Sequence, residues 1–125
     1  PGIRYLGNVP FADVPYALAA SDVLAIPYRR SPFMDAGASN KIAEAMACQR
    51  PIVATRSPNL TANFPQQAQE LEPYLAESSQ PSSLATVLAQ QLLDRKLVAA
   101  PQNIYWSGIT STLEQDLKRL NHDPA

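Results

Sequence analysis

The residues best suited to chemistry form a small-residue turn and a short helical stretch near the middle of the chain. Gly37, Ala38 and Ser39 lead into residues 40–48 (NKIAEAMAC), whose good helix formers predict a helix with Ser39 as its N-cap. The first backbone N–H groups of a helix lack intrahelical acceptors, and the helix dipole favours an anion. Because small residues let a ligand approach closely, this pattern fits a phosphate at the start of the helix.

Two charged residues follow on the outer face of the same predicted helix. Ile42, Ala45 and Met46 share one face at the i, i+3, i+4 spacing, which leaves Lys41 and Glu44 on the other side. A carboxylate at position 44 could accept hydrogen bonds from a ribose diol while phosphates rest on the helix end. Lys41 and Glu44 also fit a solvated ion pair that contributes only ~0.2–0.5 kcal/mol. The spacing alone leaves both interpretations open.

Two short strands are predicted to position this helix. Residues 23–27 (VLAIP) and 51–55 (PIVAT) are apolar and contain β-branched side chains, a composition typical of buried strands. The order strand, loop, helix, strand is a βαβ unit. In an open parallel sheet, ligands bind beyond the C-terminal ends of the strands, where residues 28–38 are expected. Arg29 and Arg30 in this loop fit either a diphosphate contact or a solvated loop.

The same stretch resembles the nucleotide-sugar site of retaining GT-B glycosyltransferases of the large family-4-like branch. That family carries E-x7-E followed by A-M-A-x-G-x-P-V-V-A, and residues 44–54 read EAMACQRPIVA. A second resemblance lies upstream, where Y-L-G-N-V precedes V-P-Y-A-L-A-A-S-D-V. The likeness is close over residues 3–55 and loose over the rest of the chain.

The resemblance implies a role for each matching residue. Glu44 would bind the ribose of the donor, and Gly37 matches the glycine that follows the first Glu of the motif. Ser39 and Asn40 match positions whose backbone amides hold the diphosphate, and Lys41 would add positive charge. The family uses a UDP- or GDP-sugar as donor substrate and needs no bound metal or other cofactor. No catalytic acid, base or nucleophile is assigned to this chain.

Two positions depart from the family pattern. The first Glu falls at Ala36, with Asp35 one residue early, and the usual glycine near the helix end is Gln49. Residues 39–44 follow the S-x-K-x-x-E variant of some relatives. Arg30 is an alternative to Lys41 as the source of added charge.

The predicted fold is one α/β domain over residues 1–125. We expect the later part of a GT-B donor domain: a Rossmann-like, three-layer α/β/α arrangement with a parallel sheet of three to four strands. The expected strands are residues 3–6, 23–26, 51–55 and 72–76. The expected helices are residues 13–20, 40–48, 82–93 and 109–120, with residues 59–69 as a loop or a loosely held helix.

Apolar spacing assigns the inward faces of the flanking helices. The side chains expected to face inward are Val14, Leu18, Leu84, Val87, Leu88, Leu92, Leu113, Leu117 and Leu120. In the helix of residues 82–93, Gln91 is expected on the outer face. Trp106 resembles the tryptophan that opens the C-terminal helix in the family.

The resemblance also implies partners. The N-terminal acceptor domain and the first two βα units of the donor domain have no counterpart in this sequence, so the chain alone is expected to be inactive. Two strands expected between residues 3–6 and residues 23–26 are also missing. Either the fragment rearranges, or a partner chain fills the gap, or residues 3–6 pair directly with residues 23–26, which is the option we favour. Exposed sheet edges favour a homodimer.

Composition narrows the class of protein. Hydrophobic residues make up 46% and charged residues 17%, which indicates a globular chain. The net charge is −1 with scattered basic residues, so nucleic acid is not an expected partner. No apolar run approaches the ~20 residues of a membrane helix. The single cysteine is typical of a reducing compartment, so we expect a cytoplasmic protein, with peripheral association with the inner face of a membrane as one option.

Three functions are compatible with these features. The leading hypothesis is the donor-binding portion of a hexosyltransferase that acts on a glycan or lipid-linked acceptor, as in polysaccharide biosynthesis. The alternative is a non-catalytic nucleotide-binding or assembly module with the same fold, which Ala36 slightly favours. A third is another α/β enzyme, such as a sugar-nucleotide epimerase, although no convincing acid/base residue is present.

Overall fold

A parallel three-stranded sheet forms the centre of the molecule. The computed structural model describes residues 2–37 and 40–122. Its strands are β1 (Leu24–Ile26), β2 (Ile52–Thr55) and β3 (Leu75–Ala76), in the order β1-β2-β3. In the register, Leu24 lies opposite Ile52 and Ala54 opposite Leu75. The predicted α/β fold with a short parallel sheet is therefore confirmed.

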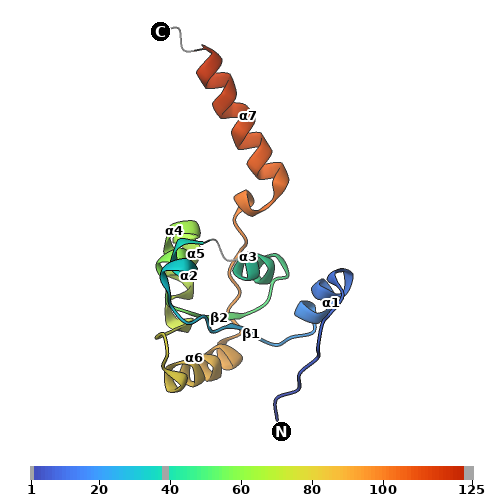
Figure 1. Cartoon of the computed structure of the whole chain (residues 1–125), viewed down its shortest axis with the longest axis vertical. Coiled ribbons are helices and arrows are strands. Elements are labelled where there is room, and N and C mark those ends of the chain that lie inside the picture. Colours follow the sequence, from blue (N-terminus) through green and yellow to red (C-terminus); the bar gives the residue numbers. More distant parts are fainter. Residues whose placement is uncertain (1, 38–39, 123–125) are drawn as a thin grey trace.

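Helices cover both faces of this sheet (Figure 1). One face carries α3 (Asn40–Ala47), α4 (Pro58–Asn63) and α5 (Pro65–Leu71), and the other carries α6 (Pro81–Asp94). Every residue of β2 is buried, as expected for a strand with helices on both sides. The arrangement matches the predicted three layers.

The helix at the centre of the sequence prediction forms as expected. In α3, Ile42, Ala45 and Met46 are at most 3% exposed and contribute to the core. Lys41 and Glu44 are exposed on the opposite face. The apolar spacing of the sequence was sufficient here because the helix packs directly on β1 and β2.

The polar segment of residues 59–69 forms two short, anchored helices, α4 and α5. Pro58 and Pro65 occupy their first positions, where the missing proline N–H removes no intrahelical bond. Ser57 caps α4, because its Oγ accepts a hydrogen bond from the backbone N–H of Leu60 at 3.4 Å. Leu60 and Leu71 are fully buried. Both helices are held in the core, so "loosely held" was too weak an expectation.

A further short helix, α2 (Pro32–Ala36), lies within the loop expected between β1 and α3. Ser31 is its N-cap, since its Oγ accepts a hydrogen bond from the backbone N–H of Met34 at 3.2 Å. The Ser-Pro start is a helix signal that the sequence analysis did not use.

The N-terminal segment contradicts the prediction of a first strand. Residues 3–6 are neither helix nor strand, and Ile3 and Tyr5 are 104% and 87% exposed. They do not pair with β1, whose one partner among the described residues is β2. A strand pattern cannot form a ladder without a neighbouring strand. The segment continues into η1 (Phe11–Asp13) and α1 (Val14–Ala19), where Val14 and Leu18 are half-buried.

The inward face of α6 differs from the prediction at two positions. Leu84, Val87 and Leu88 pack against the core, but Leu92 is 46% exposed and Gln91 is fully buried. The helical period explains the difference, since residue 91 lies seven positions after Leu84 on the same stripe. Gln91 is tolerated there because its amide is satisfied. Its Nε2 donates to the Ile52 carbonyl at 2.9 Å and to the Lys96 carbonyl at 3.2 Å, and its Oε1 accepts from the Lys96 N–H at 3.0 Å.

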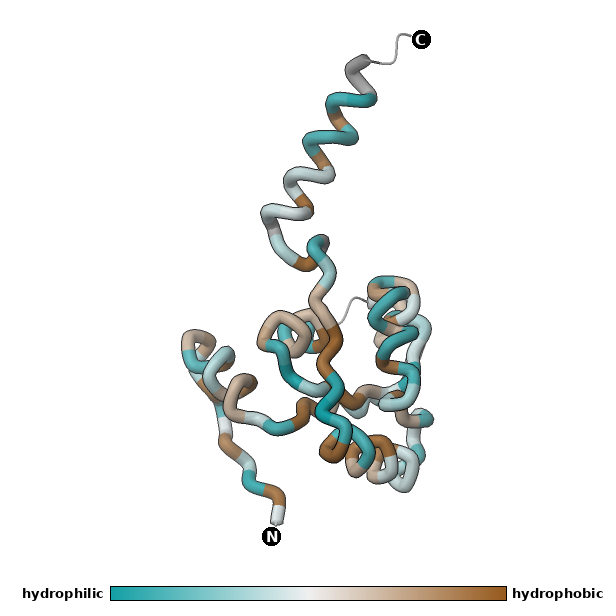
Figure 2. The backbone as a smooth tube through the Cα atoms, turned by 180° about the vertical axis from the view of Figure 1, so that it is seen from behind, coloured by the Kyte–Doolittle hydropathy of each residue, from teal (hydrophilic) through white to brown (hydrophobic). Residues whose placement is uncertain are grey.

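The C-terminal part leaves the domain as a long helix. After η2 (Glu72–Tyr74), β3 and α6, the chain buries Val98 and passes through η3 (Gln102–Ile104) into α7 (Trp106–His122). Figures 1 and 2 show α7 projecting away from the sheet, with apolar residues recurring along it. The helix begins at Trp106, three residues before the predicted start at residue 109, and at the tryptophan that resembles the one opening the C-terminal helix of the family.

The prediction that the leucine side chains of α7 face inward was wrong. Leu113 and Leu117 are 56% and 51% exposed, because no other element of the described chain covers this part of the helix. The side chain of Leu120 lies outside the described residues. Within the described part of the chain, no helix combines the length and apolarity needed to cross a bilayer.

Candidate functional site

A hollow of about 440 Å³ lies where α2 ends and α3 begins. It brings together three of the residues selected from the sequence, Gly37, Asn40 and Lys41. Ser39, the fourth residue of this turn, lies outside the described residues. The complete lining consists of Tyr28, Phe33, Met34, Ala36, Gly37, Asn40, Lys41 and Asn59.

Gly37 is exposed in this hollow, and nothing within residues 2–37 and 40–122 requires a glycine there. Its φ of −88° and ψ of 170° are accessible to any residue. A Cβ at this position would meet the Phe33 carbonyl oxygen at 3.7 Å and Asn59 Nδ2 at 3.9 Å, which are ordinary contacts. Neither backbone strain nor packing explains the residue. A glycine in open space is suited to close approach of a ligand to the backbone.

Lys41 contributes a positive charge to the same hollow. Its Nζ lies 5.9 Å from the centroid of the Tyr28 ring, within the range of a cation–π contact. The alternative of a Lys41–Glu44 ion pair is not realised among the described residues. The Lys41 side chain therefore borders the hollow beside the Tyr28 ring.

Glu44 does not line this hollow. It is exposed one turn further along α3, on the wall of a second, mainly apolar hollow of about 180 Å³ between α1 and α3. The other residues of that wall are Phe11, Val14, Pro15, Leu18, Ala47 and Cys48. The structure thus separates the predicted ribose ligand from the predicted phosphate ligands along one helix face.

The carboxylate nearest to the missing first Glu is engaged elsewhere. Arg30 Nη2 lies 2.8 Å from Asp35 Oδ2, and Arg30 Nε donates to both carboxylate oxygens at 3.3 and 3.2 Å. These hydrogen bonds and the charge of Asp35 raise the pKa of Arg30 above its ordinary value. Ala36, which lines the large hollow, has no polar side chain.

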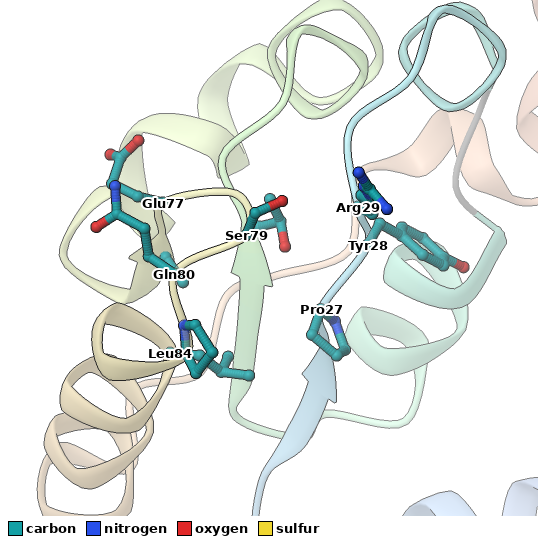
Figure 3. A pocket seen from close by; sticks show the side chains of 10 residues that line it. Pro27, Tyr28, Arg29, Glu77, Ser79, Gln80 and Leu84 are labelled. Carbon is teal, nitrogen blue, oxygen red and sulfur yellow. The ribbon is translucent and has the colours of Figure 1, made fainter.

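A third hollow, of about 300 Å³, was not identified from the sequence. It lies at the C-terminal ends of the strands, where Thr55 and Ala76 end β2 and β3. Figure 3 shows Glu77, Ser79 and Gln80 across from Tyr28 and Arg29. The signal that could have found it is the convergence of parallel strand ends, which requires the correct order of all three strands. Its lining is Pro27, Tyr28, Arg29, Thr55, Ala76, Glu77, Ser79, Gln80, Pro81 and Leu84.

The described side chains form no candidate metal site. Among residues 2–37 and 40–122, no three His, Cys, Asp or Glu side chains gather into a group that could hold a metal ion.

Comparison with known proteins identifies the family. A family model described as "Glycosyl transferases group 1" matches residues 1–94, a span that includes the sheet and helices α1 to α6. No curated protein matched the chain, and no solved structure did. Because the matched span exceeds half of the 125 residues, the chain belongs to the group 1 glycosyl transferases.

Proposed function

We propose that this chain is the donor-binding portion of a retaining, GT-B, family-4-like glycosyltransferase. It would transfer a hexose from a UDP- or GDP-sugar to a glycan or lipid-linked acceptor bound by a separate N-terminal domain. Membership of the group 1 glycosyl transferases supports the reaction class. The observation that carries the proposal is Gly37, an exposed glycine that the described part of the fold does not require, on the wall of the hollow at the start of α3.

The diphosphate of the donor is assigned to this hollow. The first N–H groups of α3 have no intrahelical acceptors, and the helix dipole adds a partial positive charge at the same end. Lys41 supplies a full positive charge beside them. In transfer, the leaving group is a nucleoside diphosphate whose negative charge grows as the sugar bond breaks. Preorganised N–H groups and a cation stabilise that charge electrostatically.

The nucleoside is assigned to the outer face of α3 beyond the diphosphate. Asn40 and Glu44 lie four residues apart and therefore on the same face, about 6 Å apart along the helix axis. A donor lying along this face would place its ribose hydroxyls at the Glu44 carboxylate. The apolar wall between α1 and α3 would then contact the flat face of the base. This arrangement accounts for the position of Glu44 outside the phosphate hollow.

A second candidate function is a non-catalytic nucleotide-binding or assembly module. The specific observation in its favour is the bidentate contact between Arg30 and Asp35, which uses the carboxylate nearest to Ala36. With that carboxylate occupied, the hollow offers no acidic side chain to the hydroxyls of a transferred sugar. The two candidates differ in whether the sugar of the donor is recognised.

Saturation-transfer NMR with UDP, GDP and ADP tests the proposed site. We expect transfer to the ribose protons of one nucleotide and its loss in Glu44→Ala. Glu114→Ala on the exposed part of α7 is the matched control and should leave the transfer unchanged. Absence of transfer to every nucleotide from the folded wild-type chain would contradict the proposal.

A further inference from the structure

Asn59 connects α4 to the segment on which the proposed diphosphate site is built. Its side chain is 6% exposed, and its Nδ2 donates to the Met34 carbonyl at 3.0 Å and to the Gly37 carbonyl. The two acceptors lie 25 and 22 positions earlier in the sequence. One buried amide thus bridges two elements that are distant along the chain.

The two carbonyls belong to the end of a helix that cannot satisfy them itself. The last four carbonyls of any helix lack intrahelical donors, and α2 has only five residues. The Asn59 amide supplies a donor there from a different element. It therefore acts as a tertiary cap that ends α2 at a defined point and fixes the backbone at Gly37.

Asn59 is well placed for this role because α4 itself is fixed. The neighbouring Leu60 is fully buried, and Ser57 caps the start of the helix. Asn63, one turn later, makes a weaker contact of the same kind. Its Nδ2 lies 3.4 Å from the Gly37 carbonyl and 2.8 Å from the Asn59 carbonyl, and its side chain is exposed.

Within the described part of the chain, one half of the Asn59 side-chain amide has partners and the other half has none. Its Oδ1 is buried and has no hydrogen-bond partner among the described residues. A buried acceptor without a partner destabilises a protein, and such groups are rare in native structures. The placement of Met34 and Gly37 by Nδ2 is the benefit that offsets this penalty.

We propose that Asn59 is a positioning residue for the donor site. It holds the backbone at Met34 and Gly37 in the arrangement that receives the diphosphate, without contacting the reacting atoms. This inference rests on the proposed function, and it adds a residue outside the stretch that resembles the donor-site motif.

The test compares Asn59→Asp with Asn63→Asp, the same chemical change one turn away, and adds the uncharged variants Asn59→Leu and Asn63→Leu. Each variant is titrated with UDP and with inorganic pyrophosphate. The order of the Gly37 and Asn40 backbone amides is measured by heteronuclear NOE, with α6 amides as an internal standard. Both Asn59 variants should bind both ligands about tenfold more weakly, because an unanchored Gly37 must be ordered on binding, and should show lower order at Gly37. The Asn63 variants should remain within about twofold of wild type, because the exposed bond contributes less.

Three results would overturn the inference. The first is wild-type affinity and wild-type Gly37 order in folded Asn59→Leu. The second is equal weakening by Asn59→Leu and Asn63→Leu, which would indicate a general property of α4. The third is a wild-type chain that binds none of UDP, GDP, ADP and pyrophosphate, which would overturn the proposed function as well. Binding by wild type separates the failure of the inference from the failure of the proposed function.

Discussion

Glu44 lies one helical turn beyond Asn40 on the exposed face of α3, and the two residues line different hollows. Asn40 belongs to the hollow that contains Gly37 and Lys41, whereas Glu44 belongs to the apolar hollow shared with α1. A single compact anion would therefore not contact both residues. A ligand extended along the helix, with an anionic group and a hydroxyl-bearing ring, would.

Replacement of Gly37 by alanine should affect UDP binding and fold stability in different ways. Gly37→Ala should leave stability unchanged or raise it by about 0.4–1 kcal/mol, because its φ suits alanine and the new Cβ meets only ordinary contacts. The same methyl group would occupy space next to the proposed diphosphate and weaken UDP binding about tenfold. Thermal denaturation and titration calorimetry measure the two effects.

Gly2→Ala is the matched control for this variant, since a Cβ at Gly2 meets no atom within 4 Å. Equal UDP affinities of wild type and Gly37→Ala would show that the ligand does not approach the backbone at Gly37.

Restoring a carboxylate at position 36 tests recognition of the sugar. Ala36 is exposed in the large hollow, so Ala36→Glu can be accommodated without repacking the core. In wild type, UDP-glucose and UDP should bind with affinities within about threefold of each other, because the hollow has no acidic side chain. Ala36→Glu should strengthen binding of UDP-glucose about tenfold relative to UDP.

Ala36→Gln, which has a similar shape without the charge, should show a smaller gain in the same titration. A strong preference of wild type for UDP-glucose over UDP would show that the hollow recognises the sugar without a carboxylate at position 36, and would disfavour the non-catalytic alternative.

Gln91 is predicted to be a major determinant of stability. Gln91→Leu would leave the Ile52 carbonyl and both Lys96 backbone groups without their present partners at a fully buried position. Loss of these bonds should lower the free energy of unfolding by about 2–4 kcal/mol. Gln66→Leu, at an exposed position of α5, is the control and should change it by less than about 0.5 kcal/mol. Urea denaturation of both variants measures these changes. Similar midpoints for the two variants would show that Gln91 is not a major determinant of stability.

The Tyr74–Asp94 contact predicts how stability depends on pH. Tyr74 Oη donates to Asp94 Oδ2 at 2.8 Å, and Gln90 Nε2 donates to the same oxygen at 2.7 Å. These bonds, that of Gln90 first, hold the pKa of Asp94 below its ordinary value of 3.8. A carboxylate with a lowered folded-state pKa stabilises the fold above the unfolded-state pKa, and this contribution is lost as the pH falls through the folded-state pKa.

The Tyr74 phenol makes stability depend on pH in the opposite direction. Its hydrogen bond to Asp94, followed by burial, raises the pKa of Tyr74 above 10.0, so its contribution is present below that pH and is lost as the pH rises further. Urea denaturation should be measured at acid and at alkaline pH. The free energy of unfolding should depend less on pH in the acid range in Asp94→Asn, and less on pH in the alkaline range in Tyr74→Phe. Unchanged profiles in both variants would show that the contact does not form in solution.

The sequence was informative where local pattern and tertiary environment agree. Residues 40–47 combine good helix formers with an apolar face, and the sheet accepts that face directly. The apolar run ending at Thr55 became a fully buried strand for the same reason.

Predictions failed where a partner element decides the structure. Residues 3–6 have a strand pattern but no neighbouring strand to complete it. Leu113 and Leu117 form an apolar stripe that nothing in the described chain covers. Gln91 lies on the inward stripe of α6 by helical period, but its polarity suggested an outward position until the acceptors in β2 and the donor at Lys96 were known.

The sequence identified residues of the candidate site, but not their separation into two hollows. Gly37, Asn40 and Lys41 do converge on one hollow. The placement of Glu44 beside α1 depends on where α1 lies relative to α3, which no local motif encodes. The role of Asn59 depends on contacts with residues more than twenty positions away, so it could be recognised only after folding.

Titration of the ¹⁵N-labelled chain with UDP tests the central claim most directly. The account predicts the largest backbone amide shifts at Gly37, Asn40 and Lys41, smaller shifts at Glu44, and none along α6. Largest shifts at Arg29, Glu77 and Gln80 would place the ligand in the hollow at the strand ends and contradict the account. Absence of any shift in the folded chain at millimolar UDP would contradict nucleotide binding itself.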